Sequence, residues 1–462
     1  MNSIFFARQY AEDTKPQGAE STTRNIGVNA VFNYSYDDRL LFDATFRTNA
    51  SSQFGANQRW GNFWSLGAGW NMHNEKWLRS KEWFSRLKLR ASVGSTGSQG
   101  NNAYQSLATY NYSEKNYENK LGAYLMGMEN KDLKWQKKMD YNVGMDMSVK
   151  NNFNLVFDYY QSTTENLLVA FTLPPSTGFT TVQENVGKVR NTGIELSMSY
   201  MVLSRPQDRT FLTLSLRAAH NKNRVVKISD SMKAYNEKRD EMAESDSKLV
   251  TKYYDGVSMN AIWAVRSLGI DPATGREIYL TKDGVSTYEY RAEDMVVCGD
   301  NLPKLRGSFG INLGYKGFGL NVMCMYELGA KMYNETLVDR VENVNMSYAV
   351  DKRVLEGRWQ KPGDKVRFRS LKQVWDPEKQ AYKVDEKTYA TSRFVQKKNE
   401  LNISSINFSY DFFRHAFVKK MGMERLSVAF YMNDVAKLST IKTERGLSYP
   451  FARNYNFSLQ MT

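Results

Sequence analysis

The chain repeatedly alternates apolar and polar residues with a period of two. Clear examples are Leu40–Phe46, Ile194–Tyr200 and Tyr449–Met461, where apolar side chains alternate with polar or small ones over most positions. Successive residues of a β-strand point to opposite faces of the sheet. The pattern therefore predicts strands with one apolar face and one hydrated face.

The same reasoning predicts about thirteen strands along the chain. Most of them form pairs joined by short turns, such as SYDD at 35–38, Lys150-Asn151-Asn152 and Lys316-Gly317. The predicted strands are 24–35, 39–50, 58–72, 85–96, 135–149, 152–165, 188–202, 209–222, 303–316, 317–328, 399–413, 423–434 and 449–461.

The connections between these pairs are long. They are 97–134, 166–187, 223–302, 329–398 and 435–448. Short turns on one side and long loops on the other are typical of an outer-membrane barrel, whose long loops face out. We therefore predict an all-β fold, an antiparallel transmembrane β-barrel, with small structures inside the longest loops.

Composition is compatible with this fold. Mean hydropathy is -0.58, and no stretch approaches the roughly 20 apolar residues of a membrane helix. A barrel exposes only every second strand residue to lipid, so a polar average does not argue against it. Net charge is +14, but Lys and Arg are spread along the chain without a basic module, which argues against nucleic-acid binding.

An odd strand number has a topological consequence. If the short turns are periplasmic, the last strand ends in the periplasm, and residues 1–23 begin outside the cell. Single-chain bacterial barrels have an even strand number with both ends inside. The count therefore predicts that an N-terminal part is missing; the alternative is that one strand is miscounted.

Several long stretches resemble the SusC/RagA-like family of TonB-linked outer-membrane receptors. They include YDDRLLFDATFRTNASSQFGANQRWGNFWSLGAGW (36–70), LPPSTGFTTVQENVGKVRNTGIEL (173–196) and VDKRVLEGRWQKPGD (350–364). The others are 87–101, 260–284, 391–401 and 424–461. Together they follow the family's order over nearly the whole chain.

The resemblance implies a barrel of about 22 strands with an N-terminal plug, located in the cell outer membrane. It implies a SusD-like surface lipoprotein as partner, energy from TonB, and a glycan or oligopeptide as ligand. Residues 1–462 would be the C-terminal portion of the barrel domain, in contact with outer-membrane lipid, without the plug and the early strands. The chain also ends at Thr462, where the family usually has an aromatic residue. Since open strand edges are costly in lipid, we expect a split barrel completed by a second polypeptide, or a remnant.

No catalytic constellation is found, so we do not expect an enzyme, and no cofactor or metal is expected. Asp271 and Glu277 are close in sequence, but Asp-Pro-Ala-Thr-Gly indicates a turn. Two cysteines and three scattered histidines lack the spacing of metal ligands.

Binding by the long loops is the better hypothesis, because rigid strands hold such loops in place. Aromatic side chains there suit sugar rings or the apolar groups of peptides, although they could instead pack the loops together or against the lid. The candidates for ligand or lid contact are Tyr253, Tyr254, Trp263, Trp359 and Trp375. An alternative function is a secreted β-rich protein for carbohydrate binding or adhesion.

Overall fold

The computed structural model describes most of the chain. The described residues are 20–79, 81, 83–98, 103–112, 122–172, 181–229, 232–237, 239, 249–344, 350–371, 373–376, 381–384, 388–413, 415–442 and 452–462. Some of these are described by their backbone alone. Across this part of the chain, no helix is both long and apolar enough to cross a membrane.

Thirteen strands form the main sheet, and their order in the sheet follows their order in the chain. They are β1 (Asn25–Tyr36), β2 (Leu40–Ser51), β3 (Trp60–Asn71), β4 (Phe84–Ser98), β7 (Gln136–Val149), β8 (Phe153–Thr172), β9 (Thr181–Arg205), β10 (Thr210–Lys227), β15 (Leu305–Tyr315), β16 (Phe318–Tyr333), β19 (Val395–Asp411), β20 (Leu426–Ser439) and β21 (Tyr455–Met461). Each of the thirteen predicted strands overlaps one of these, which confirms the all-β prediction.

The predicted ends are wrong at several long connections. Residues 166–187 were expected to be a connection, but β8 continues to Thr172 and β9 begins at Thr181. β16 continues beyond residue 328 and β20 beyond residue 434. Both contain a β-bulge, near Gly329 with φ +79 and near Asp434 with φ 52. A bulge interrupts the alternation without ending the strand, which explains why the pattern predicts strands that are too short.

The short turns are confirmed by their backbone geometry. Asp37 and Asp38 both have positive φ, and the Arg39 amide donates to the Tyr36 carbonyl. Lys316 and Gly317 also have positive φ, between the register partners Tyr315 and Phe318. Two such residues in succession favour the hairpin turns whose twist matches that of paired strands.

The chain divides into two compact units. The first comprises 1–68, 91–141 and 162–189, and the second comprises 69–90, 142–161 and 190–462. In the first unit, Phe54, Phe63 and Trp135 form a small buried cluster in which Phe54 stacks on Trp135 at 4.2 Å. This unit also holds the hairpin of β5 (Thr109–Tyr112) and β6 (Ala123–Gly127).

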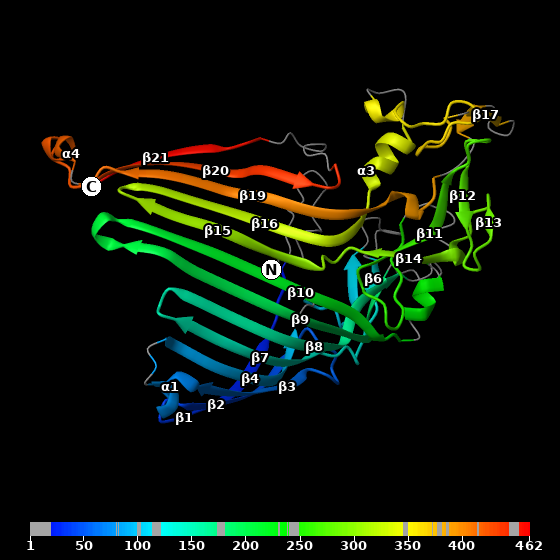
Figure 1. The fold of residues 1–462 in the computed structure, drawn as a ribbon. Coiled ribbons are helices and arrows are strands. Elements are labelled where there is room, and N and C mark those ends of the chain that lie inside the picture. Colours follow the sequence, from blue (N-terminus) through cyan, green and yellow to red (C-terminus); the bar gives the residue numbers. More distant parts are fainter. Residues whose placement is uncertain are drawn as a thin grey trace. The chain divides into compact units, whose positions relative to one another are not determined.

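In the second unit, β10, β15, β16, β19, β20 and β21 run side by side as an antiparallel wall (Figure 1). The register places apolar residues opposite one another across five strands. One such row consists of Ile311, Val322, Ile406, Met432 and Tyr455. Large side chains of this face are exposed, including Phe457 at 78% and Phe408 at 46%.

The other face of this wall is polar. The neighbouring register row consists of Asn312, Asn321, Asn407, Tyr431 and Asn456. Ion pairs also lie across the strands, such as Lys398 with Glu327 at 3.2 Å and Lys437 with Glu400 at 2.8 Å. An exposed apolar face backed by a hydrated one is the arrangement of a barrel wall in a bilayer.

The two ends of this wall differ. At one end, β19 and β20 are joined by a short segment containing the helix α4 (Ala416–Lys420). At the other end, the long connections form a small structure of their own (Figure 1). Its sheet has the order β13 (Ser286–Thr287), β12 (Glu277–Leu280), β11 (Ala261–Ile270) and β14 (Met295–Asp300). The expectation of local structure in the longest loops is confirmed.

The remaining elements are short. They include the α-helices α1 (Lys76–Arg79) and α3 (Glu335–Leu337). Short 3-10 and π segments in the described part of the chain include η3 (Met72–Asn74), η5 (Pro206–Asp208), η6 (Ala292–Asp294), η7 (Val338–Glu342), η8 (Lys352–Val354) and η9 (Ser392–Phe394). A further hairpin pairs β17 (Gln373–Asp376) with β18 (Ala381–Val384).

Candidate functional site

The described long connections of the second unit form what we call the loop module, residues 249–300, 334–344, 350–371 and 388–394. Its central strand is β11, whose residues 261–265 are all buried. Trp263 and Val265 belong to one apolar cluster, and Ile262 belongs to another with Phe368 and Phe394. A strand between two clusters cannot shift without disturbing both, so the module has a defined packing of its own.

Of the predicted contact residues, Trp263 belongs to the first cluster, Tyr254 packs against Trp263, and Tyr253 precedes Tyr254 in the chain. Trp263 is 8% exposed and packs with Tyr279 and Met295. The ring of Tyr254 lies 5.0 Å from that of Trp263 and is 40% exposed. Tyr253 is half-buried, and its backbone amide donates to the side-chain oxygen of Asn236 at 2.9 Å. Of these three, only Tyr254 offers a largely accessible ring.

The other two candidates, Trp359 and Trp375, lie in segments far from residues 253–263 along the chain. The indole of Trp359 donates to the Pro272 carbonyl at 2.9 Å and lies against Gly275, which fixes the turn at 271–275. Asp271 caps that turn by accepting from Thr274 and from the Ala273 amide, and these hydrogen bonds lower its pKa. The prediction of a turn is thus confirmed. Trp375 lies in β17, and its side chain lies outside the described residues.

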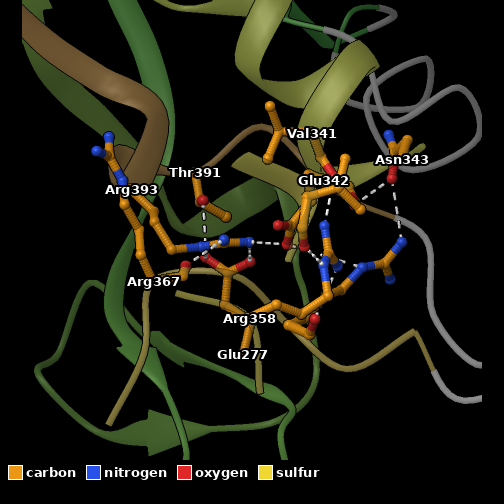
Figure 2. Close-up of polar contacts among 11 residues, drawn as sticks. Glu277, Val341, Glu342, Asn343, Arg358, Arg367, Thr391 and Arg393 are labelled. Carbon is orange, nitrogen blue, oxygen red and sulfur yellow. Dashed lines mark hydrogen bonds and ion pairs between the residues drawn. The ribbon is translucent and has the colours of Figure 1, made fainter. Parts of the chain in front are cut away.

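A buried charge network joins the connections of the module (Figure 2). Arg393 of η9 forms ion pairs with Glu277 at 2.7 Å and with Glu342 at 2.6 Å. The side chains of the three residues are 6%, 2% and 0% exposed. Thr391 donates a further hydrogen bond to Glu277 at 2.8 Å. One guanidinium therefore holds β12, η7 and the segment leading into β19.

Arg358 extends the network by binding backbone carbonyls. It donates to Val354 at 2.7 Å, to Arg369 at 2.8 Å and to Val341 (Figure 2). Arg369 in turn donates to the Asn343 side chain at 3.1 Å. Arg358 thereby satisfies carbonyls that would otherwise be buried without a donor, which is costly.

Burial and attraction compete within the network. Burial by itself lowers the pKa of Arg393, but Glu277 and Glu342 outweigh it and raise that pKa above its ordinary value. Burial lowers the pKa of Arg358, and Glu342 opposes this effect. Arg393 is therefore charged at every physiological pH. It is the shared cation of both carboxylates, and Glu342 has a second, longer ion pair with Arg369 at 3.7 Å.

The sequence gives no signal for this network. Glu277 and Arg393 are 116 residues apart, and Glu342 and Arg393 are 51 apart. Charged residues are common in loops, and no spacing marks these as partners. Within the described residues, no group of three or more His, Cys, Asp or Glu side chains is arranged to hold a metal.

The amphipathic wall and its loop module define the class of protein, an outer-membrane β-barrel. Residues 5–350, about three quarters of the chain, match the family model described as TonB dependent receptor-like, beta-barrel. The chain belongs to this family, whose members are found in the cell outer membrane.

Curated relatives agree. The chain is similar to TonB-dependent receptor P39 of Formosa agariphila, with 24% identity over 94% of this chain and 45% of that protein. It is also similar to the TonB-dependent receptor SusC of Bacteroides thetaiotaomicron, with 29% identity over 53% of this chain and 26% of that protein. The resemblance to SusC-like receptors is confirmed. The chain spans about half the length, or less, of the curated relatives it matches.

Among solved structures, the RagAB peptide transporter has a similar fold. The TM-score is 0.79 at 19% identity, and the match covers 95% of this chain and 48% of that chain. This likeness confirms the barrel fold over nearly all of the chain.

Proposed function

We propose that this chain forms part of the transport barrel of a TonB-dependent nutrient receptor of the SusC-like type. The proposal rests on the wall formed by β15, β16, β19, β20 and β21. One face of this wall carries exposed rows of apolar side chains, and the other carries rows of Asn, Ser and ion-paired side chains. A soluble protein would rarely expose apolar rows of this extent. The apolar face contacts lipid, and the polar face lines the route of the solute.

In this proposal the loop module faces the cell exterior and takes part in ligand capture. The ligand is a glycan or an oligopeptide, and the partners are a SusD-like surface lipoprotein and TonB. Tyr254 is the strongest of the five aromatic candidates for contact with ligand or lid, because its ring is exposed and packs against the buried ring of Trp263. Trp263 and Trp359 support the module by packing and by the hydrogen bond to Pro272.

No chemical step is part of this function. Capture requires only that the module and the lid hold the ligand, and movement requires work supplied through TonB. The family is one of receptors, and the buried charge network binds protein groups rather than a substrate.

Fractionation of cell envelopes tests the proposal against the secreted alternative. The protein should remain with outer membranes after carbonate extraction and dissolve only in detergent. Its migration on a gel should change with heating, as it does for folded barrels. Recovery in the carbonate-soluble fraction would favour a secreted carbohydrate-binding or adhesion protein.

A further inference from the structure

A hollow of about 510 Å³ lies on the wall of the second unit, among β8, β9, β10, β15 and β16. Its lining includes Arg217, Ala219, Arg306, Ser308 and Glu327. The register pairs Arg217 with Ser308, Ala219 with Arg306, and Arg306 with Glu327. These positions share the face of the Asn312–Asn321 pair, so the hollow opens on the polar face.

Two carboxylates of this lining already have cations. Asp158 binds Arg90 at 2.7 Å, and Glu327 binds Lys398 at 3.2 Å. Three other charged side chains of the lining differ. Among the described residues, Glu195, Arg217 and Arg306 have no side-chain hydrogen bond or ion pair, and all three are exposed.

The two arginines are placed where they repel. Since Arg217 pairs with Ser308, it is the diagonal neighbour of Arg306 on the adjacent strand. Such positions lie about 7–8 Å apart, within reach of long side chains. Two like charges at this distance repel each other, and Glu327, directly opposite Arg306 on β16, offsets part of that repulsion. The small residues Ala219 and Ser308 beside them leave space for another molecule. An anionic group bound between the guanidiniums would offset the remaining repulsion.

Glu195 adds a negative charge to the lining that contains Arg217 and Arg306. It lies on β9, where a side chain at Gly193 would clash with the carbonyl of His220 on β10, so β9 and β10 approach closely here. Strands lie about 4.8 Å apart, so β9 and β15 are about 10 Å apart. A peptide of three residues spans about the same distance.

From these observations we infer that Glu195, Arg217 and Arg306 form a binding site for the charged ends of a short peptide. The two guanidinium groups bind the peptide's carboxylate, because a guanidinium can donate two parallel hydrogen bonds to a carboxylate. Glu195 binds the peptide's ammonium group. A polyanionic glycan fits less well, because the carboxylate of Glu195, which has no cation of its own, would repel it. This site rests on the proposed transport function and specifies a ligand class for the polar face.

Titration calorimetry on the receptor purified from outer membranes tests the site. The probes are tri-alanine with free ends, its N-acetylated form, its C-amidated form and trigalacturonate. Tri-alanine should bind most tightly. R217Q/R306Q should weaken its binding by about 10- to 100-fold, since bonds to charged groups are lost. E195Q should weaken binding of tri-alanine but not of the N-acetylated form.

The control is R224Q, which removes an exposed charge from the opposite face of β10. It should bind tri-alanine as the unchanged receptor does. Equal binding by R217Q/R306Q, or no binding of tri-alanine by the unchanged receptor, would overturn the site. Tighter binding of trigalacturonate would assign the arginines to glycan carboxylates and overturn the peptide assignment. Heat-modifiable migration of the same samples reports on the barrel separately, so failure of the site is distinguishable from failure of the proposed function.

Discussion

Replacing Arg393 by methionine should release the connections that the buried network holds together. Methionine keeps most of the apolar length of the side chain but leaves Glu277 and Glu342 without their shared cation. These carboxylates are 2% and 0% exposed, so water cannot compensate them. Removing one partner of such a buried pair costs about 3–5 kcal/mol.

The assay is hydrogen exchange at amides that close the loop module. The Asn334 amide donates to the Phe394 carbonyl at 3.0 Å, and the Val265 amide donates to the Ala390 carbonyl at 3.1 Å. If the module opens locally, a loss of about 3 kcal/mol accelerates exchange at these amides by about 100-fold or more. Amides in the centre of β16 should be unaffected, because the wall is held by its own ladder.

A matched control removes a short but less buried ion pair from the same module. Arg353 binds Asp351 at 2.6 Å, with side chains 17% and 20% exposed. R353Q should cost at most about 1 kcal/mol. In addition, the triple variant R393M/E277Q/E342Q should recover much of the loss, because neutral groups can replace a buried ion pair. Equal exchange in R393M and R353Q would refute the reasoning.

Three further changes test other parts of the structure. G307A should prevent correct pairing of β10 with β15, because a Cβ there would lie 1.9 Å from the Arg217 carbonyl and 2.7 Å from the Tyr326 hydroxyl. Heat-modifiable migration should be lost in this variant. The control G127A, where the nearest contact of a Cβ is 3.3 Å, should keep it. Lys252 is 4% exposed, and burial together with Lys282 lowers its pKa from 10.5 to about 8. Because the unfolded state then holds more protons between pH 8 and 10.5, stability of the module should rise with pH in that window. Stability is measured by hydrogen exchange in the module at each pH, corrected for intrinsic exchange rates. A similar rise of stability with pH in K252M would contradict this assignment. The Leu337 amide donates both to the side chain of Asn334, which caps α3, and to the Asn334 carbonyl, each at 3.1 Å. N334A removes the side-chain acceptor and should cost about 1 kcal/mol, seen as faster exchange at Leu337 but not at Val265.

The alternation of side chains predicts the wall because it is a local property of the chain. Each strand carries its own apolar and polar faces, and the short turns carry residues such as Asp37, Asp38 and Gly317 that accept positive φ. Strand ends are predicted less well. At Gly329 and Asp434 the pairing passes through a bulge, and only the partner strand shows that the ladder continues.

The candidate site depends on contacts that sequence distance hides. Tyr254 and Trp263 were predicted as contact residues, yet only tertiary packing shows that one is exposed and the other buried. The partnership of Arg393 with Glu277 and Glu342, and the diagonal placement of Arg217 and Arg306, follow from register and loop folding.

The sequence by itself therefore determined which segments are strands and which face of each is apolar, since a period of two is written into every strand. The tertiary structure alone decided which charged side chains form ion pairs and which remain exposed without a partner. Coulombic attraction acts between neighbours in space, and long connections bring together residues that no local pattern relates.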